Sequence, residues 1–406
     1  MSLNAPYTDE IEWPHGLEPF DANSFKIQAN PFPHFAWMRE NAPVLKARTP
    51  TGDLWFISRY QDVQMALRSP KIFSSSTFDP DVLPLILLMD PPRHTRLRET
   101  VARAFTPKAV ARFEDQIRQL AVRYFDPMMT NGGGDVVEDF AVQLTIGTIG
   151  ALLGIPVSET ARLKSWTDDL ANYFGRVARR APGSPGDKEG VNEFLAFLKS
   201  VLEQAVKDED ETVVGNLARL WKSGDMDEAD ALHFCAFLFG AGHETTTILI
   251  ANGFLTLCEQ PRLLGLLQQD ETKIAKFVDE LVRFRAAPQR LSRITTQDTE
   301  VQGYLVPEGS HVRLLPGSAN RDSAKFPDGE RFDIDRDTTG HIGFGYGIHA
   351  CIGAWLARLE AQIAFQLVAQ RLSAVRLDGN YPVLFYQGGT LSNTGPRSLH
   401  VKLTGQ

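Results

Sequence analysis

A cysteine near the C-terminus, Cys351, stands in a segment that could hold a thiolate against a flat ligand. It belongs to residues 344–353, FGYGIHACIG, which include three glycines. Glycines let the backbone turn tightly and approach a ligand closely. The apolar stretch at 354–367 predicts a helix directly after the loop. A thiolate at the start of that helix is favoured by the helix dipole and by the free N–H groups of the first turn.

The longest helical pattern, residues 227–259, contains a second unusual segment at 237–246, FLFGAGHETT. Gly240 and Gly242 each cost about 1 kcal/mol in a helix interior. The hydroxyl of Thr245 can bond to the carbonyl four residues earlier, which also bends helices. These residues predict a kink in the helix. Close packing against another helix through small residues is the alternative explanation.

Both segments resemble motifs of the cytochrome P450 family. Residues 344–353 fill every fixed position of F-G-x-G-x-H-x-C-x-G, and residues 241–245 match A-G-x-[DE]-T. Further matches are E-x-x-R at 280–283, N-R-D at 320–322 and D-P-P-x-H-x-x-x-R at 90–98. The matches follow the order of the family, so the resemblance covers nearly the whole chain.

The resemblance implies that Cys351 is the axial ligand of the iron in haem b. A thiolate ligand pushes electron density onto the iron and favours O–O cleavage, and iron bonded to sulfur lowers the pKa of the thiol. Without the motif, Cys351 would be assigned as a buried free thiol. Residues expected beside the haem are Ala241, Phe344 and Gly353. Those expected at the haem propionates are His94, Arg98, Arg293 and His349.

Glu244 and Thr245 are the expected catalytic residues. Oxygen activation consumes two protons, and the Thr245 hydroxyl can hold oxygen and a water molecule by hydrogen bonds. The Glu244 carboxylate can relay protons from solvent. The family often has aspartate at this position, and glutamate leaves the role unchanged.

Glu280 and Arg283 lie on one face of a predicted helix. Most such pairs are solvated and weak. In the family, however, they pair with the arginine of the N-R-D segment, here Arg321. The resemblance therefore implies a buried network of one carboxylate and two guanidinium groups, which has a structural role near the haem loop.

Periodicity predicts a large, mostly helical protein. Amphipathic segments occur at 107–128, 137–153, 191–205 and 273–284, and strand-like alternation at 54–58, 295–315 and 383–403. Asp225 and Glu228 are spaced like a capping box before the long helix, and Pro261 marks its end. The resemblance adds the cytochrome P450 fold, mainly α with small β-sheets. Because no linker is visible, we expect residues 1–406 to form a single large domain.

Composition excludes several classes of protein. The 406 residues carry 42 basic and 50 acidic side chains, a net charge of −8, which argues against nucleic acid and anionic membranes as partners. The N-terminal residues contain no apolar stretch typical of a signal peptide or anchor. Three cysteines form no disulfide framework. We expect a cytoplasmic monomer, and the resemblance to the family implies a bacterial type.

The substrate pocket is expected above the haem, from four segments that are largely apolar. Its expected residues are Leu85, Ile86, Leu87, Phe237, Gly240, Gln289, Arg290, Leu291, Ser392, Asn393 and Thr394. Arg290 could anchor a substrate carboxylate or, more commonly, point to solvent. The charges at 176–180 could attract anionic substrates or simply be solvated.

The resemblance implies a haem-thiolate monooxygenase that inserts one oxygen atom from O2 into a small to medium, largely apolar molecule. Hydroxylation and O-demethylation are the expected reactions. Electrons would come from ferredoxin and ferredoxin reductase, or from flavodoxin, and an acidic partner could dock on a basic patch. The patch comprises Arg93, Arg96, Arg103, Lys108, Arg112 and Arg358. The alternatives are an enzyme of this fold that uses peroxide or catalyses coupling, rearrangement or dehydration, and a haem-based ligand sensor.

Overall fold

The computed structural model describes residues 4–22, 24–50, 52–77, 85–178, 188–207, 212–386 and 393–406. Ser392, Arg179 and Arg180 lie outside these ranges, and so does the loop at 181–187. The side chain of Arg176 is likewise outside the description.

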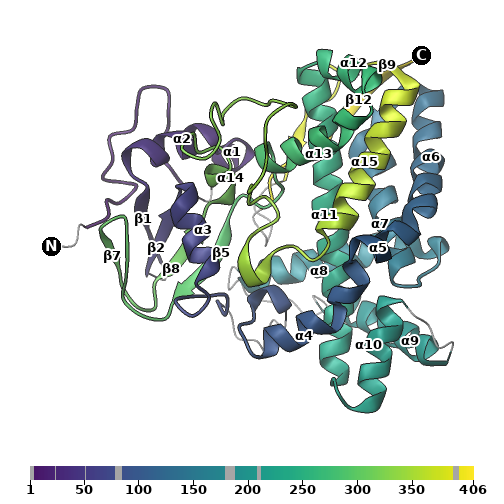
Figure 1. Ribbon diagram of the computed structural model, residues 1–406, viewed down its shortest axis with the longest axis horizontal. Helices are drawn as coiled ribbons and strands as arrows, with labels where there is room; N and C mark the ends of the chain where they lie inside the picture. Colours follow the sequence, from purple (N-terminus) through teal and green to yellow (C-terminus); the bar gives the residue numbers. More distant parts are fainter. Residues whose placement is uncertain are drawn as a thin grey trace.

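Helices form most of the protein, and the longest, α11 (Glu228–Glu259), runs through its centre (Figure 1). It packs against α7, α9, α13 and α15. The other α-helices are α1 (Phe25–Ala29), α2 (Phe32–Asn41), α3 (Tyr60–Arg68), α4 (Arg93–Ala102), α5 (Pro107–Val110), α6 (Glu114–Asn131), α7 (Val142–Leu152), α8 (Thr160–Ala178), α9 (Glu189–Lys207), α10 (Val213–Ser223), α12 (Arg262–Gln269), α13 (Thr272–Phe284), α14 (Pro316–Ala319) and α15 (Ala354–Arg371). Short helical turns are η1 (Ile86–Leu88), η2 (Arg103–Phe105), η3 (Ala111–Phe113), η5 (Val157–Glu159), η6 (Gly347–His349) and the π-turn η4 (Val136–Ala141).

The strands form small sheets, and the largest lies beside the helical body (Figure 1). This five-stranded sheet has the order β1-β2-β8-β5-β3, in which β2 and β8 are parallel. The strands are β1 (Val44–Thr49), β2 (Gly52–Ile57), β3 (Phe73–Ser74), β4 (Gly133–Asp135), β5 (Leu291–Thr295), β6 (Thr299–Val301), β7 (Tyr304–Val306), β8 (His311–Leu314), β9 (Leu372–Leu377), β10 (Leu384–Phe385), β11 (Pro396–Ser398) and β12 (His400–Gly405). The prediction of a mainly α fold with small sheets is confirmed.

Packed aromatic rings hold the central helices together. Phe254 of α11 lies 5.8 Å from Phe365 of α15 and 6.1 Å from Phe140, measured between ring centroids. Phe365 in turn meets Phe277 of α13 edge-on at 5.0 Å. All four side chains are fully buried. Such ring pairs add about 0.5–1.5 kcal/mol each beyond the burial of their apolar area.

Several local predictions need correction. The N-cap of α11 is Asp227, whose carboxylate accepts from the Asp230 N–H at 2.6 Å, so Asp225 is not the capping residue. The expected bond from the Thr245 hydroxyl to the Ala241 carbonyl is present at 2.8 Å, within a helix that continues through Gly240. Strands β1 and β9 were not expected, because each lacks a clear alternation of apolar and polar residues.

Helix α11 is also long and apolar enough to cross a membrane, alone among the helices in the described ranges. Its most apolar window is 67% buried inside the protein. This burial fits a core helix that is hydrophobic on all sides.

Two helical glycines, Gly253 of α11 and Gly265 of α12, provide a matched test of helix packing. A Cβ at Gly253 would lie 2.0 Å from the Phe365 ring, whereas a Cβ at Gly265 of α12 would meet nothing within 4 Å. We expect Gly253→Ala to lower the free energy of unfolding by about 1–3 kcal/mol through overpacking. Gly265→Ala should raise it by roughly 0.5–1 kcal/mol. Denaturant unfolding of the two variants measures both, and a stabilising Gly253→Ala would contradict the packing described.

Candidate haem-binding site

The loop around Cys351 is held by its own backbone. The Cys351 N–H donates to the Phe344 carbonyl at 2.7 Å, closing the turn before α15. Gly345 and Gly347 have φ values of +71° and +70°, a conformation that disfavours other residues. A Cβ at Gly347 would also lie 2.4 Å from the Leu67 carbonyl oxygen. The glycines are therefore needed to fold the loop closely against α3.

Cys351 has an accessible surface, although many protein atoms surround it. Burial raises the pKa of its thiol, and three neighbours act in the opposite direction. These are the Gly353 N–H, which donates to the sulfur, and the guanidinium groups of Arg98 and Arg358. The positive charges and the N–H group favour the thiolate form of Cys351.

Four donor side chains gather beside this loop: His94, Arg98, Arg293 and His349. The rings of His94 and His349 lie 4.2 Å apart between centroids. Both nitrogens of His94 and Nε2 of His349 are buried without a hydrogen-bond partner. None of the four side chains forms an ion pair within the described part of the chain. Unsatisfied buried donors of this kind are costly, and they fit a ligand that carries carboxylates.

Burial lowers the pKa of each of these donors. For Arg293 the pKa falls to about 10 and for His349 to about 3, with burial as the main cause and nearby positive charge adding to it at His349. The Asp90 carboxylate acts in the opposite direction on Arg293 and His94. An anionic group bound beside these side chains would stabilise their charged forms. It would thereby offset the cost of their burial and the repulsion between them. The residues therefore fit the two propionates of the expected haem.

Glu244 lies one residue before Thr245 on α11 and is largely surrounded by protein. Burial raises the pKa of its carboxyl, and the nearby Asp168 raises it further. The nearby Asn393 amide acts in the opposite direction. A carboxyl with a raised pKa exchanges protons closer to neutral pH, which suits a proton relay.

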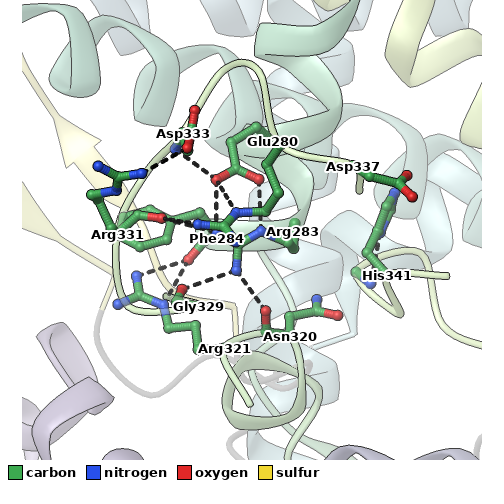
Figure 2. Close-up of polar contacts among 12 residues, drawn as sticks. Glu280, Arg283, Phe284, Asn320, Arg321, Gly329, Arg331, Asp333, Asp337 and His341 are labelled. Carbon is green, nitrogen blue, oxygen red and sulfur yellow. Dashed lines mark hydrogen bonds and ion pairs between the residues drawn. The ribbon is translucent and has the colours of Figure 1, made fainter. Parts of the chain in front are cut away.

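The Glu280–Arg283 pair is fully buried and bidentate. Arg283 Nε donates to Glu280 Oε2 at 2.6 Å, and Arg283 Nη2 to Oε1 at 2.7 Å. The remaining donors of Arg283 bind backbone carbonyls, as Figure 2 shows. Their acceptors are Asn320 at 2.6 Å, Gly329 at 3.0 Å and Arg331 at 3.2 Å.

The expected contact between Arg321 and Glu280 is wrong. Arg321 instead donates to the Phe284 carbonyl and to Glu330 (Figure 2 shows the former contact). Its guanidinium is held there by the Phe284 ring, 3.6 Å from the ring centroid. The second arginine of the network is Arg336, whose Nε lies 3.4 Å from Glu280 Oε1. Sequence reasoning missed Arg336, because nothing in its local pattern shows that the chain returns to Glu280.

The expected pocket segments come together in part. An antiparallel bridge joins Pro288 to Asn393, and the Thr394 N–H donates to the Ala287 carbonyl at 2.8 Å. Leu85 and Ile86 are buried, and Leu87, Phe237, Gly240 and Leu291 are partly buried. The Gln289 side chain is directed toward Gly317 of α14.

Arg290 does not point to solvent. It donates to the Ala22 carbonyl at 3.0 Å, and burial lowers its pKa to about 10. Two members of the expected basic patch are also engaged, because Arg93 pairs with Asp230 at 2.5 Å and Arg358 with Asp279 at 2.7 Å. The members that remain exposed are Arg96, Arg103, Lys108 and Arg112.

Comparison with known proteins shows similarity along most of the chain. A model of the cytochrome P450 family matches residues 188–400. Cytochrome P450 109 of Bacillus spizizenii is 35% identical over 347 residues, 85% of this chain and 85% of that protein. The vitamin D(3) 25-hydroxylase of Pseudonocardia autotrophica is 33% identical, over 88% of this chain and 90% of that protein. The structure of cytochrome P450 CYP109Q5 from Chondromyces apiculatus superposes with a TM-score of 0.83 at 31% identity, covering 95% of this chain and 98% of that one.

The buried pair can be tested against a surface pair nearby. Glu280→Gln removes the charge that compensates the Arg283 guanidinium, so we expect the free energy of unfolding to fall by about 3–5 kcal/mol. Arg331→Ala removes an ion pair with Asp333 whose arginine side chain is 66% exposed, and should cost no more than about 1 kcal/mol. Denaturant unfolding with haem content as a second readout measures both. Equal losses of unfolding free energy in the two variants would contradict the larger contribution expected from the buried pair.

Proposed function

The chain belongs to the cytochrome P450 family and is a haem b monooxygenase, and we propose that it hydroxylates or O-demethylates a small to medium, largely apolar molecule. The observation that carries the proposal is the closed, glycine-rich loop that places the Cys351 sulfur beside the Gly353 N–H and the guanidinium groups of Arg98 and Arg358. Haem iron with a thiolate ligand supplies the activation of O2 and the transfer of one oxygen atom to the substrate.

In this proposal Cys351 holds the iron as a thiolate. The Gly353 N–H and the charges of Arg98 and Arg358 stabilise its negative charge from the protein side. His94, Arg98, Arg293 and His349 bind the propionates, which gives partners to the ring nitrogens of His94 and His349 that otherwise lack them. Phe344, Ala241 and Gly353 line the haem, and the contacts of Glu280, Arg283 and Arg321 hold the surrounding backbone in place.

Proton delivery falls to Glu244 and Thr245. Glu244 takes a proton from the solvent side and passes it toward the Thr245 hydroxyl, which holds O2 and water in the pocket. The Thr245 hydroxyl already donates to the Ala241 carbonyl at 2.8 Å, so its oxygen lone pairs remain available as acceptors. The presence of both residues favours use of O2 over use of peroxide.

The substrate class follows from the pocket and from one relative. Leu85, Ile86, Leu87, Phe237 and Leu291 provide apolar surface, with Gly240 leaving room on α11. A relative that is 33% identical is a vitamin D(3) 25-hydroxylase. We propose that this chain acts as a cytoplasmic monomer and receives electrons from ferredoxin and its reductase, or from flavodoxin. The exposed Arg96, Arg103, Lys108 and Arg112 would attract such acidic partners.

The first test concerns the iron ligand. The reduced protein with carbon monoxide should show the strongly red-shifted Soret band of thiolate-ligated haem, because the ligand is Cys351. Cys351→Ser should lose this band and monooxygenase turnover. Cys258→Ser is the control, since burial raises the pKa of that thiol to about 12 and keeps it protonated. A red-shifted band in Cys351→Ser would refute the assignment.

The second test concerns the proton relay. Thr245→Ala should lower the fraction of reductant recovered as product several-fold and raise peroxide release, while Thr245→Ser keeps the hydroxyl and most of the coupling. Thr247→Ala is the control on the same helix, because the Thr247 hydroxyl bonds to Thr145 of α7 at 2.9 Å. Product and peroxide are measured per NADPH consumed. Coupling that stays unchanged in Thr245→Ala would remove Thr245 from the mechanism.

A further inference from the structure

The segment 393–395 runs along the face of α11 that carries Glu244. Glu244, Ile248 and Asn252 are spaced four residues apart and so share one face of the helix. A Cβ at Gly395 would lie 2.4 Å from Ile248 Cγ2 and 3.3 Å from Asn252 Nδ2. Glycine is therefore required at 395 for the segment to approach the helix so closely. Asn393, two residues before Gly395, lies close enough to Glu244 to lower the pKa of its carboxyl.

The backbone of Asn393 is fixed from the other side. It forms a bridge with Pro288, and the next residue, Thr394, bonds to the Ala287 carbonyl at 2.8 Å. The Asn393 residue is only 5% exposed. Its amide lies within reach of the Glu244 carboxylate and favours the charged form, although neither amide atom has an aligned hydrogen-bond partner.

Two other titratable groups act near Glu244. Asp168 of α8 repels its carboxylate, and the Tyr386 hydroxyl beyond β10 has a pKa raised by burial and by the nearby Glu244 charge, so it stays neutral. Asp168 is also paired with Lys164 at 2.7 Å, so that lysine is engaged. Among the groups that act on Glu244, Asn393 is the one that stabilises the carboxylate.

Building on the proposed function, we propose that Asn393 is a positioning residue for proton delivery, whose amide holds the Glu244 carboxylate against α11 in line with Thr245. Glu244 releases its proton toward Thr245 and regains one from solvent. The Asn393 amide keeps both of its N–H protons throughout. A neutral amide suits this cycle. A lysine or arginine in its place would stabilise the carboxylate so strongly that reprotonation near neutral pH would be suppressed.

A double-mutant cycle tests this inference. Four proteins are compared: wild type, Glu244→Gln, Asn393→Leu and the double variant. Glu244→Gln should lower product per NADPH several-fold, and Asn393→Leu should do so to a similar or smaller extent. In the double variant Asn393→Leu should cause no further loss, because it acts through Glu244. The reduced carbon monoxide spectrum should stay as in wild type.

Asn393→Asp provides a second route if the leucine variant does not fold. It has the same size and places a like charge beside Glu244, so coupling should fall in the wild-type background and recover in the Glu244→Gln background. Asn380→Leu, at an exposed position before β10, is the control and should behave as wild type.

The outcomes separate the two proposals. Losses that add in the double variant, or unchanged coupling in both Asn393 variants while Glu244→Gln uncouples, would overturn the role of Asn393 and leave the proposed function intact. Unchanged coupling in Glu244→Gln would overturn the relay itself and the role of Asn393 with it.

Discussion

The cysteine loop depends on a buried ion pair that does not touch it. Arg283 uses its donors on Glu280 and on three backbone carbonyls between residues 320 and 331. Asn320, one of those residues, accepts the Ile342 N–H on its side chain at 2.7 Å. Gly343 then passes so close to Val282 that a Cβ would lie 2.2 Å from the Val282 carbonyl. The pair thus fixes the path of the chain up to the start of the cysteine loop.

Buried arginines in this protein fall into two groups. The donors of Arg283 find acceptors within the protein, and an arginine satisfied in this way has a structural role. Arg293 is almost as deeply buried, yet its described contact is the carbonyl of the preceding residue at 2.6 Å. Neither ring nitrogen of the neighbouring His94 has a hydrogen-bond partner among the described residues. Unsatisfied buried polar groups are rare in folded proteins, so the unpaired ring nitrogens of His94 and His349 near the cysteine loop support a ligand site there.

The sequence was most informative where chemistry requires contiguous residues. The cysteine loop, the Glu244–Thr245 pair and the Glu280–Arg283 pair are each local patterns, and the long helices follow from periodicity. Partners that depend on the path of the chain could not be predicted. Arg336 replaces Arg321 at Glu280, and Arg290 turns to the Ala22 carbonyl. The capping residue of α11 differed by two positions, because several acidic residues near its start could cap equally well.

The parallel pairing of β2 with β8 has a consequence for how the protein is made. The open edge of the strand at residues 52–57 stays unpaired until residues 311–314 have been synthesised. At typical rates of translation this interval lasts roughly 10–50 s. During that time a two-stranded hairpin with an unpaired edge is exposed, and such edges recruit other strands. Slow translation or crowding of nascent chains should therefore favour aggregation through the N-terminal hairpin, and chaperone capture of this hairpin would protect the yield of folded protein.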